Sequence, residues 1–138
     1  GIKFSDAAIK GPVGESAFES IVAVRQRLDL YANIRPARSY EGVPYAGKID
    51  AVIVRENTED LYKGIEFEVQ GVATSLRIIS ERATRRIAKV AAAYAVKRKK
   101  HVTVVHKANV LRVSDGLFRR VALEELGNNG LMKSTSMR

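Results

Sequence analysis

The sequence predicts an α/β fold with parallel strands, flanking helices and one β-hairpin. Residues 51–54 form a continuous apolar run, which is typical of a strand in a parallel sheet. Apolar and polar residues alternate through 65–78, on either side of Gln70-Gly71, which is the pattern of a hairpin with one apolar face. Residues 81–99 repeat apolar side chains at helical spacing. A chain of 138 residues is long enough for one domain with a buried core.

The N-terminal part is expected to add a short strand at 6–10, a helix, and a strand at 30–34. Ser16 and Glu19 have the spacing of a capping box, so the helix should begin there. Arg35-Pro36 is expected to end the second strand. The apolar stripe of the helix, at steps of three and four, consists of Ala17, Ile21, Val24 and Leu28.

The C-terminal part is expected to contain the longest helix at 81–99, a buried strand at 102–105 and a last helix at 114–126. The apolar stripe of the longest helix consists of Ala83, Ile87, Val90, Ala91 and Tyr94.

The last residues have no regular pattern. Two glycines flank Asn128-Asn129 and should break the preceding helix, and 131–138 shows neither strand alternation nor a helical stripe. We therefore divide the chain into a folded part, 1–126, and an irregular tail, 127–138.

The composition excludes several function classes. The chain has no cysteine, which excludes disulfides, thiolate metal sites and cysteine nucleophiles. It has no apolar run of about eighteen residues and no signal-peptide segment, so we expect a cytoplasmic protein without a membrane partner. The net charge is +9, which could indicate binding to a nucleic acid. However, no aromatic residues interleave with the basic run 97–100, and cations at the C-terminal end of a helix are favourable in any case. We therefore expect no nucleic-acid partner.

Four cations and a tyrosine favour a binding site. Arg55 and Lys107 each follow an apolar run, and ligands of open α/β sheets bind at the carboxyl ends of strands. Arg25 lies beside the apolar stripe of the first helix, and Arg35 follows the second predicted strand. Buried cations are costly without an anionic partner. The pattern therefore indicates a site for a small polycarboxylate, with Tyr62 and Lys107 available for proton transfer.

Each of these residues also has an ordinary structural explanation. Taken alone, Arg25 would be an exposed helix residue, Tyr62 a packing aromatic with a bonded hydroxyl, and Lys107 a surface lysine. Several of these residues occur within longer sequence motifs. Those motifs distinguish a role in a binding site from an ordinary structural role.

Three motifs in the chain together resemble one family. They are DLYANIRP at 29–36, VRENTEDLY at 54–62 and HKANV at 106–110. In this order and spacing the sequence resembles the β-decarboxylating dehydrogenases, which act on isopropylmalate, isocitrate or homoisocitrate. The resemblance runs from about residue 6 to about residue 125, and it looks closest to the archaeal 3-isopropylmalate dehydrogenases.

The resemblance implies a role for each matching residue. In the family the arginines matching Arg25, Arg35 and Arg55 bind the malate carboxylates, for which forked guanidinium groups are well suited. The tyrosine matching Tyr62 is the general acid. The lysine matching Lys107 enters from the partner subunit and assists removal of the hydroxyl proton. In the family, the asparagine matching Asn109 lies near the nicotinamide of the cofactor.

Substrate choice in the family depends on the helix before the first arginine. Isocitrate enzymes place a serine and an asparagine where this chain has Glu19 and Ile21. A glutamate would repel the extra carboxylate of isocitrate, whereas Ile21 and Val22 offer an apolar wall for an isopropyl group. We therefore favour isopropylmalate. Isocitrate and homoisocitrate remain alternatives, because one apolar substitution discriminates by only about 1–3 kcal/mol.

The resemblance also implies parts that this chain does not contain. A complete family member is well over twice as long, and its metal-binding aspartates and most of its NAD-binding residues lie downstream of the matched part. We therefore expect a truncated isopropylmalate dehydrogenase-like fold with no metal ligand. NAD and Mg²⁺ or Mn²⁺ are expected for the family, but this chain alone is not expected to bind them or to act as a dehydrogenase.

The predicted hairpin at 65–78 corresponds to the arm through which two family subunits pair. An isolated hairpin is only marginally stable in water, so its apolar face should pack on another subunit. We therefore expect a homodimer or a larger homo-oligomer. A non-catalytic dimeric binding module remains the alternative to an enzyme fragment.

Overall fold

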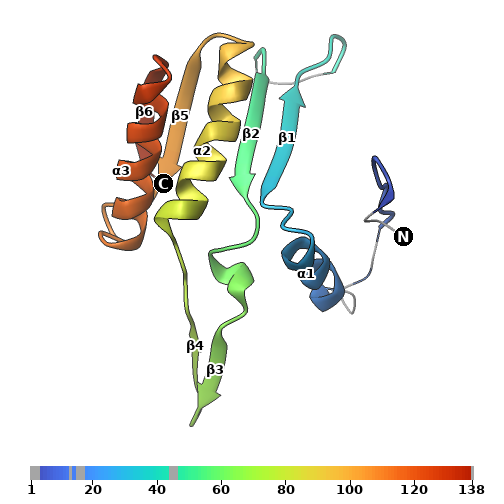
Figure 1. The fold of residues 1–138 in the computed structure, drawn as a ribbon, viewed down its shortest axis with the longest axis vertical. Helices are drawn as coiled ribbons and strands as arrows, with labels where there is room; N and C mark the ends of the chain where they lie inside the picture. Colours follow the sequence, from blue (N-terminus) through green and yellow to red (C-terminus); the bar gives the residue numbers. More distant parts are fainter. Residues whose placement is uncertain (1–3, 13, 15–17, 44–46, 138) are drawn as a thin grey trace.

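The computed structural model describes residues 4–12, 14, 18–43 and 47–137, and it shows the predicted α/β architecture (Figure 1). The helices are α1 (Phe18–Arg27), α2 (Glu81–Val96) and α3 (Ser114–Asn128), and a short 3-10 helix, η3, covers Leu61–Lys63. The strands are β1 (Ala32–Arg38), β2 (Asp50–Glu56), β3 (Glu66–Val69), β4 (Val72–Ser75), β5 (His101–His106) and β6 (Met132–Met137).

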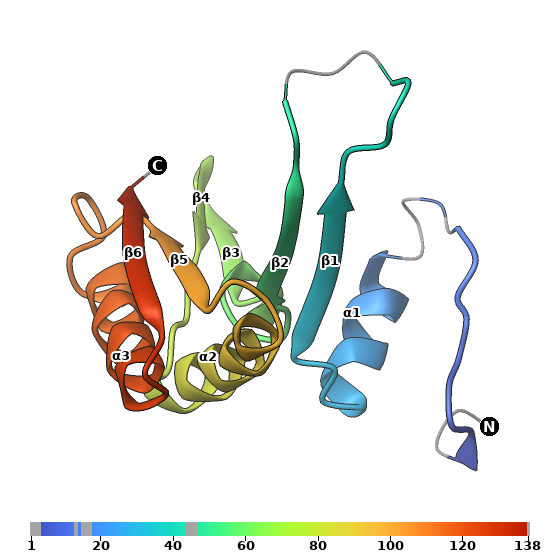
Figure 2. The ribbon, with the colours of Figure 1, turned by 90° about the horizontal axis from the view of Figure 1, so that it is seen from above.

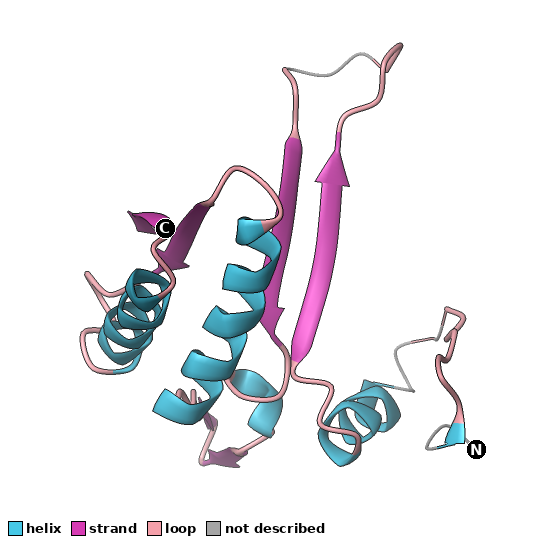
Figure 3. Cartoon of the chain, turned by 45° about the horizontal axis from the view of Figure 1, so that its top comes forward, coloured by secondary structure: helices cyan, strands magenta, loops and turns pink. Residues whose placement is uncertain are grey.

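The strands form three separate pairs. β1 and β2 are antiparallel, β3 and β4 form the predicted hairpin, and β5 and β6 are parallel. Helix α2 packs against both β2 and β5, and α3 packs against α2, β5 and β6. Figures 2 and 3 show α2 beneath the space between the β1–β2 pair and the β5–β6 pair, with the hairpin projecting from the body in Figure 1.

The core lies where α2, α3 and β5 meet. Helix α2 begins at Ser80, whose side-chain oxygen accepts a hydrogen bond from the backbone N–H of Ala83 at 3.1 Å. Small side chains on α2 allow close contact with α3. The buried apolar residues of this cluster are Ala88, Ala92, Ala95, Val104, Ala122, Leu126 and Leu131. The predicted helices at 81–99 and 114–126 are thus confirmed, although Tyr94 of the predicted stripe is 41% exposed.

Two strand predictions are corrected by the pairing of β1 with β2. The strand predicted to stop at Arg35-Pro36 continues through both residues to Arg38. Proline is tolerated here because β1 is paired on one side only among the described residues. The run at 51–54 was predicted as a central parallel strand, but β2 is antiparallel to β1. Its residues alternate between half-buried and exposed, so a continuous apolar run does not identify a strand covered on both faces.

Two predictions at the N-terminus have different outcomes. The strand predicted at 6–10 is wrong, because the structure has no strand there and Ile9 is fully exposed. The capping box of Ser16 and Glu19 lies outside the described residues, since Ser16 and the side chain of Glu19 are not described. The helix itself is confirmed as α1.

The tail was predicted to be irregular, and for 132–137 this prediction is wrong. These residues form β6 by pairing in parallel with β5 along its whole length. Gly130, at φ 63°, makes the turn that directs the chain back, and the backbone N–H of Met132 donates to the carbonyl of Lys100 at 3.0 Å. Backbone pairing and buried Leu131 therefore hold a strand whose side chains carry no strand pattern. The division of the chain at residue 126 stays a prediction.

The hairpin has the geometry expected of a two-residue loop. Gln70 and Gly71 both have positive φ values, 50° and 77°, as a type I′ turn requires. The apolar side chains that alternate along the hairpin remain exposed in the single chain, with Phe67 at 56% and Val72 at 66%. The hairpin is therefore formed, but its apolar residues are left uncovered.

Replacing Leu126 by alanine should lower the free energy of unfolding by about 2–5 kcal/mol, because Leu126 is 1% exposed and the cavity cannot be refilled. Replacing Leu61, which is 60% exposed, by alanine should change it by less than about 0.5 kcal/mol. Urea denaturation of the two variants measures the difference. Equal losses would contradict a core centred on α3.

Candidate functional site

Acidic residues at the end of β2 and just after it fold the loop that precedes the site. The carboxylate of Glu56 accepts hydrogen bonds from the backbone N–H of Thr58 at 2.8 Å, from its hydroxyl at 2.7 Å, and from the backbone N–H of Glu59 at 2.7 Å. Glu59 is buried and accepts from the N–H and the hydroxyl of Ser80, at 2.8 and 2.7 Å. Because Ser80 caps α2, this carboxylate ties the loop to the start of that helix.

Asp60 sets the position of Tyr62. Its backbone has φ 62° and ψ −141°, a conformation that a side chain with Cβ rarely adopts. Its carboxylate accepts from the backbone N–H of Leu61 at 3.0 Å and from Nε of Arg77 at 2.7 Å, and its own N–H donates to the carbonyl of Ile78 at 2.8 Å. These bonds hold the strained residue and start η3, which carries Tyr62.

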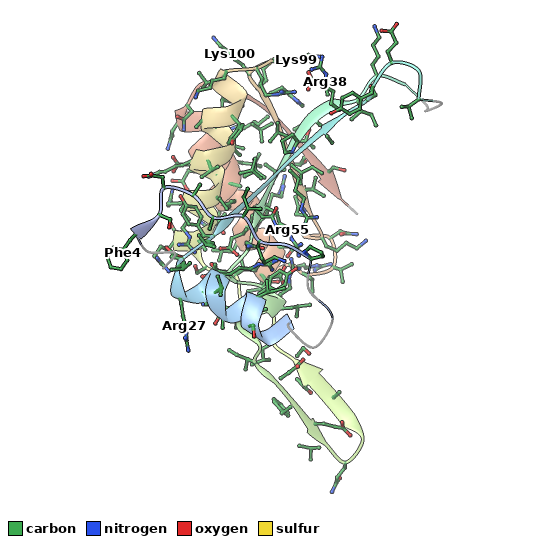
Figure 4. The ribbon with its side chains drawn as sticks, turned by 90° about the vertical axis from the view of Figure 1, so that its right-hand side faces the viewer. Phe4, Arg27, Arg38, Arg55, Lys99 and Lys100 are labelled. Carbon is green, nitrogen blue, oxygen red and sulfur yellow. The ribbon has the colours of Figure 1, made fainter. Side chains whose placement is uncertain are left out.

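Three predicted site residues meet at the ring of Tyr62. Arg55 Nη2 donates to the Tyr62 hydroxyl oxygen at 2.7 Å, and its guanidinium carbon lies 5.0 Å from the ring centroid. The guanidinium of Arg25 lies 5.7 Å from the same centroid, within the range of a cation–π contact. Gln26 donates to the Tyr62 carbonyl at 2.8 Å and joins α1 to η3. Figure 4 shows Arg55 near α1 in the middle of the molecule, whereas Arg38, Lys99 and Lys100 lie at its upper end.

Arg35 lies on the same face of the β1–β2 pair as Arg55. Asn33 is the register partner of Arg55, and Arg35 is the partner of Ile53, so all four residues share one face. Arg35 Nε donates to the side-chain oxygen of Asn33 at 3.1 Å. The opposite face of β2 is turned to α2, with Arg98 on Asp50 at 2.6 Å and Arg86 on Glu56 at 3.3 Å. The site therefore occupies the face that α2 does not cover.

The site arginines have no acidic partner in the part of the chain that the structure describes. Among the described residues no aspartate or glutamate oxygen lies within 4 Å of Arg25, Arg35 or Arg55. By contrast, each of four other arginines has at least one carboxylate partner, namely Arg77, Arg85, Arg86 and Arg98. Two guanidinium groups at the Tyr62 ring, and a third on the same strand face as Arg55, form an arrangement suited to an anion.

Lys107 is connected to Tyr62 through the ion pairs of Arg77 with Asp115 and Asp60. The backbone N–H of Lys107 donates to the carboxylate of Asp115, which is 3% exposed and pairs with Arg77 at 2.6 Å. Arg77 also binds Asp60, so one guanidinium joins the turn of Lys107 to the start of η3. Burial disfavours the charge of Arg77, but the hydrogen bond and charge of Asp60 and the charge of Asp115 outweigh it and raise the pKa of Arg77.

The other predicted site residues are close in sequence to Arg25 or to Lys107. Ile21 and Val22 are half-buried on α1, one turn before Arg25, so they lie toward the same side of the helix. Asn109 is exposed in the turn after β5, where the N–H of Val110 donates to the carbonyl of Lys107 at 3.0 Å.

Arg86 fixes α1 and the strands to α2. One of its nitrogens donates to both carboxylate oxygens of Asp29 at 2.7 and 2.8 Å, and the other donates to Thr58 at 2.7 Å and Glu56 at 3.3 Å. Its guanidinium stacks 4.2 Å from the ring centroid of Tyr31. Burial opposes its charge, yet Asp29 and Glu56 outweigh burial and raise the pKa of Arg86.

Sequence reasoning missed the residues that hold the site in place. Asn33 could have been found, because it lies two positions before Arg35 and shares its face in any strand. No local signal indicated Arg77 or Arg86, whose partners are distant in the sequence.

The comparisons identify the family. A family model described as isocitrate/isopropylmalate dehydrogenase matches residues 1–131. The chain belongs to this family. The 3-isopropylmalate dehydrogenase of Sulfurisphaera tokodaii is 56% identical over 116 residues, which cover 83% of this chain and 34% of the relative. The probable NAD isocitrate dehydrogenase subunit alpha of Drosophila melanogaster, described as mitochondrial, is 49% identical over 79% of this chain and 30% of the relative.

Solved structures agree with this assignment of the isocitrate/isopropylmalate dehydrogenase family. The crystal structure of isocitrate dehydrogenase from Methylococcus capsulatus superposes with a TM-score of 0.81 and 37% identity, over 94% of this chain and 40% of that one. The chain thus spans about a third of the length of the family members that it matches. None of the described helices is long and apolar enough to cross a membrane.

Replacing Arg77 by methionine should lower the free energy of unfolding by about 1–3 kcal/mol, because it leaves the buried carboxylate of Asp115 without its ion-pair partner. Amide chemical shifts of both Tyr62 and Lys107 should move. Arg98 is the matched control, since its side chain is similarly exposed (34% against 32%) but its partner Asp50 is 60% exposed. Its methionine variant should cost no more than about 1 kcal/mol. Unchanged shifts in the Arg77 variant would contradict the proposed link.

Proposed function

We propose that this chain carries the substrate-binding part of a 3-isopropylmalate dehydrogenase-like oxidoreductase. The supporting observation is that Arg25 and Arg55 lie at Tyr62, that Arg35 shares a strand face with Arg55, and that none of the three has a described acidic partner. The family reaction is an NAD-dependent oxidative decarboxylation of a 2-hydroxy-3-carboxy acid, a step of leucine biosynthesis for isopropylmalate. Arg25, Arg35 and Arg55 bind the carboxylates of this substrate. Forked guanidinium donors match carboxylates in geometry as well as in charge.

Tyr62 is the general acid in this proposal. Arginine can only donate hydrogen bonds, so Arg55 occupies an acceptor position of the Tyr62 oxygen and leaves the phenolic proton free to be donated. The cation 2.7 Å away also stabilises the negative charge that remains after the proton has left. Tyr62 would protonate the carbon from which carbon dioxide departs.

Lys107 assists the other proton transfer. We assign it the removal of the substrate hydroxyl proton, in the site of a partner subunit, as in the family. The apolar residues of the hairpin, exposed in the single chain, support a homodimer in which the two hairpins pair. Asn109, two residues beyond Lys107, then lies near the nicotinamide. Ile21 and Val22 face the isopropyl group.

The described residues offer no metal-binding group. Within the described part of the chain, no three histidine, aspartate or glutamate residues are grouped so that they could hold a metal ion. We therefore assign no step to Mg²⁺ or Mn²⁺, which would supply Lewis-acid activation of the keto intermediate when bound. We place the protein in the cytoplasm, in keeping with a metabolic dehydrogenase.

A non-catalytic dimeric binding module is the second candidate function. The observation that favours it is that the carboxylate-binding residues lie within the described chain, whereas a metal-binding group does not. If the chain is part of a dehydrogenase, isocitrate or homoisocitrate is the alternative substrate. Relatives named as isocitrate dehydrogenases also match the chain.

Replacing Arg25 by methionine should weaken binding of 3-isopropylmalate at least tenfold, because a charge-assisted hydrogen bond contributes about 1.5–3 kcal/mol. Arg27 is the matched control, since it lies on the same helix and is exposed, and its methionine variant should bind normally. Isothermal titration calorimetry with 3-isopropylmalate, and isocitrate alongside, measures both. Equal loss in the two variants would show attraction by net charge alone.

The pure chain should not reduce NAD in the presence of 3-isopropylmalate and Mg²⁺ or Mn²⁺, because no described group could hold the metal ion. The measurement is absorbance of NADH, with isocitrate as a parallel substrate and a full-length relative as the positive control. Metal-dependent turnover would refute the half-site proposal, whereas carboxylate binding without turnover agrees with it.

A further inference from the structure

The turn after β5 presents two of the predicted site residues. Lys107 and Asn109 are both exposed, and they lie in the turn that joins β5 to α3 (Figure 1). The carbonyl of Lys107 closes this turn, because it accepts from the N–H of Val110 at 3.0 Å and from that of Leu111 at 2.8 Å. The position of both site residues therefore depends on the groups that hold the turn.

Two buried side chains hold the turn by consecutive backbone N–H groups. Asp115 of α3 is 3% exposed, and its carboxylate accepts from the N–H of Lys107. His106, the last residue of β5, is 7% exposed, and its Nδ1 accepts from the N–H of Ala108 at 3.1 Å. Backbone N–H groups that are shielded from water need an acceptor. The turn takes two of its acceptors from side chains, one on each element that it joins.

The bond to Ala108 is possible in only one protonation state of His106. An imidazole nitrogen accepts a hydrogen bond only when it carries no proton, so the geometry assigns the proton of the neutral ring to Nε2. In the imidazolium both nitrogens are donors, and Nδ1–H would then face the N–H of Ala108. Nε2 is buried without a hydrogen-bond partner among the described residues, so no described acceptor compensates the charged ring. Protonation of His106 therefore breaks a bond that holds the turn.

Among the described residues, the elements packed around His106 supply no other histidine and no thiol. Helix α3 supplies Asp115, which pairs with Arg77 at 2.6 Å, and β6 places uncharged Met137 in register with His106. Of the α2 residues that line the same cavity, Tyr94 alone is titratable. Carboxylates ordinarily titrate near pH 4 and lysine and arginine above about pH 10, whereas histidine does so between about pH 5 and 8. From β2 and the loop after it, the charged residues that line the cavity are Arg55, Glu56, Glu59 and Asp60.

We propose that His106 is a positioning residue whose neutral ring holds the turn of Lys107 and Asn109, and that protonation of the ring releases this turn. The role rests on the proposed function, in which Lys107 assists removal of the substrate hydroxyl proton. Once the N–H of Ala108 has lost its acceptor, Asp115 is the one side chain that still holds the turn among the described residues. Proton removal through Lys107 should therefore weaken on the acid side of neutral pH, together with the order of the turn.

Nuclear magnetic resonance of the pure chain between about pH 8 and pH 5 tests this role, because histidine titrates in that window. The ring nitrogen shifts at the upper pH should show the proton of His106 on Nε2. On acidification the amide shifts of residues 107–109 should move in one transition with the ring shifts. The hydrogen-exchange protection factor of Ala108 should fall about tenfold. A neutral ring with its proton on Nδ1, a ring that stays neutral throughout, or an Ala108 amide that does not follow the ring would overturn the proposal.

Three variants separate this role from ordinary packing. His106→Asn keeps an acceptor oxygen near the place of Nδ1 but cannot titrate, so its turn should stay ordered and the transition should vanish. His106→Leu has no acceptor and should show the released turn already at the upper pH. The matched control is His101→Asn, because His101 is the other histidine, lies on the same strand and is exposed, with Nε2 3.2 Å from the hydroxyl of Ser134. Circular dichroism checks that all three fold. A transition that persists in His106→Asn, or vanishes in His101→Asn, would overturn the proposal.

Calorimetry with 3-isopropylmalate on the same samples separates a failure of this role from a failure of the proposed function. The spectra follow the turn without substrate, so they do not depend on what the site binds. A transition that follows His106 in a chain that binds no 3-isopropylmalate would support the role of His106 and refute the proposed function. Normal binding of 3-isopropylmalate without the transition would overturn the role of His106 alone.

Discussion

The position of every site arginine depends on the ion pairs of Arg86. This single guanidinium binds Asp29 at the end of α1, stacks on Tyr31 before β1, and binds Glu56 at the end of β2. Those three segments carry Arg25, Arg35 and Arg55. Because Arg86 extends from α2, it relates all three cations to one rigid helix. A second guanidinium, that of Arg77, does the same for Tyr62 and the turn of Lys107. Arginines in ion pairs thus position three arginines that have no carboxylate partner among the described residues.

The elements with strong local patterns could be predicted from the sequence. The helices at 81–99 and 114–126 and the hairpin at 65–78 have clear periods, and the structure contains all three. The sequence also singled out Arg25, Arg55 and Tyr62, and their role in binding a substrate stays a prediction. Arg25, Arg55 and Tyr62 indeed lie together.

The other features of the fold and the site depend on contacts between residues that are distant in the sequence, which no local sequence pattern indicates. Pro36 is accepted in β1 because of the edge position of that strand, which is a property of the assembled sheet. Arg86 and Asp29 are 57 residues apart, and Arg77 and Asp60 are 17 apart. The tail forms a strand because β5 offers it a free edge, whatever its side chains. Tertiary pairing overrides weak local propensity in each case.

The tail strand has a further property that follows from its composition. Lys133, Ser134, Thr135 and Ser136 are polar on both faces of β6, so neither face has an apolar set that must point to the core. The alignment of β6 on β5 is therefore set by buried Leu131 at its start and by polar contacts. The hydroxyl of Ser134 lies 2.9 Å from that of Thr103, and Lys133 Nζ donates to the carbonyl of Leu123 at 3.1 Å. A slip by two residues would break both contacts, so the register of this strand is specified by hydrogen bonds and not by an apolar face.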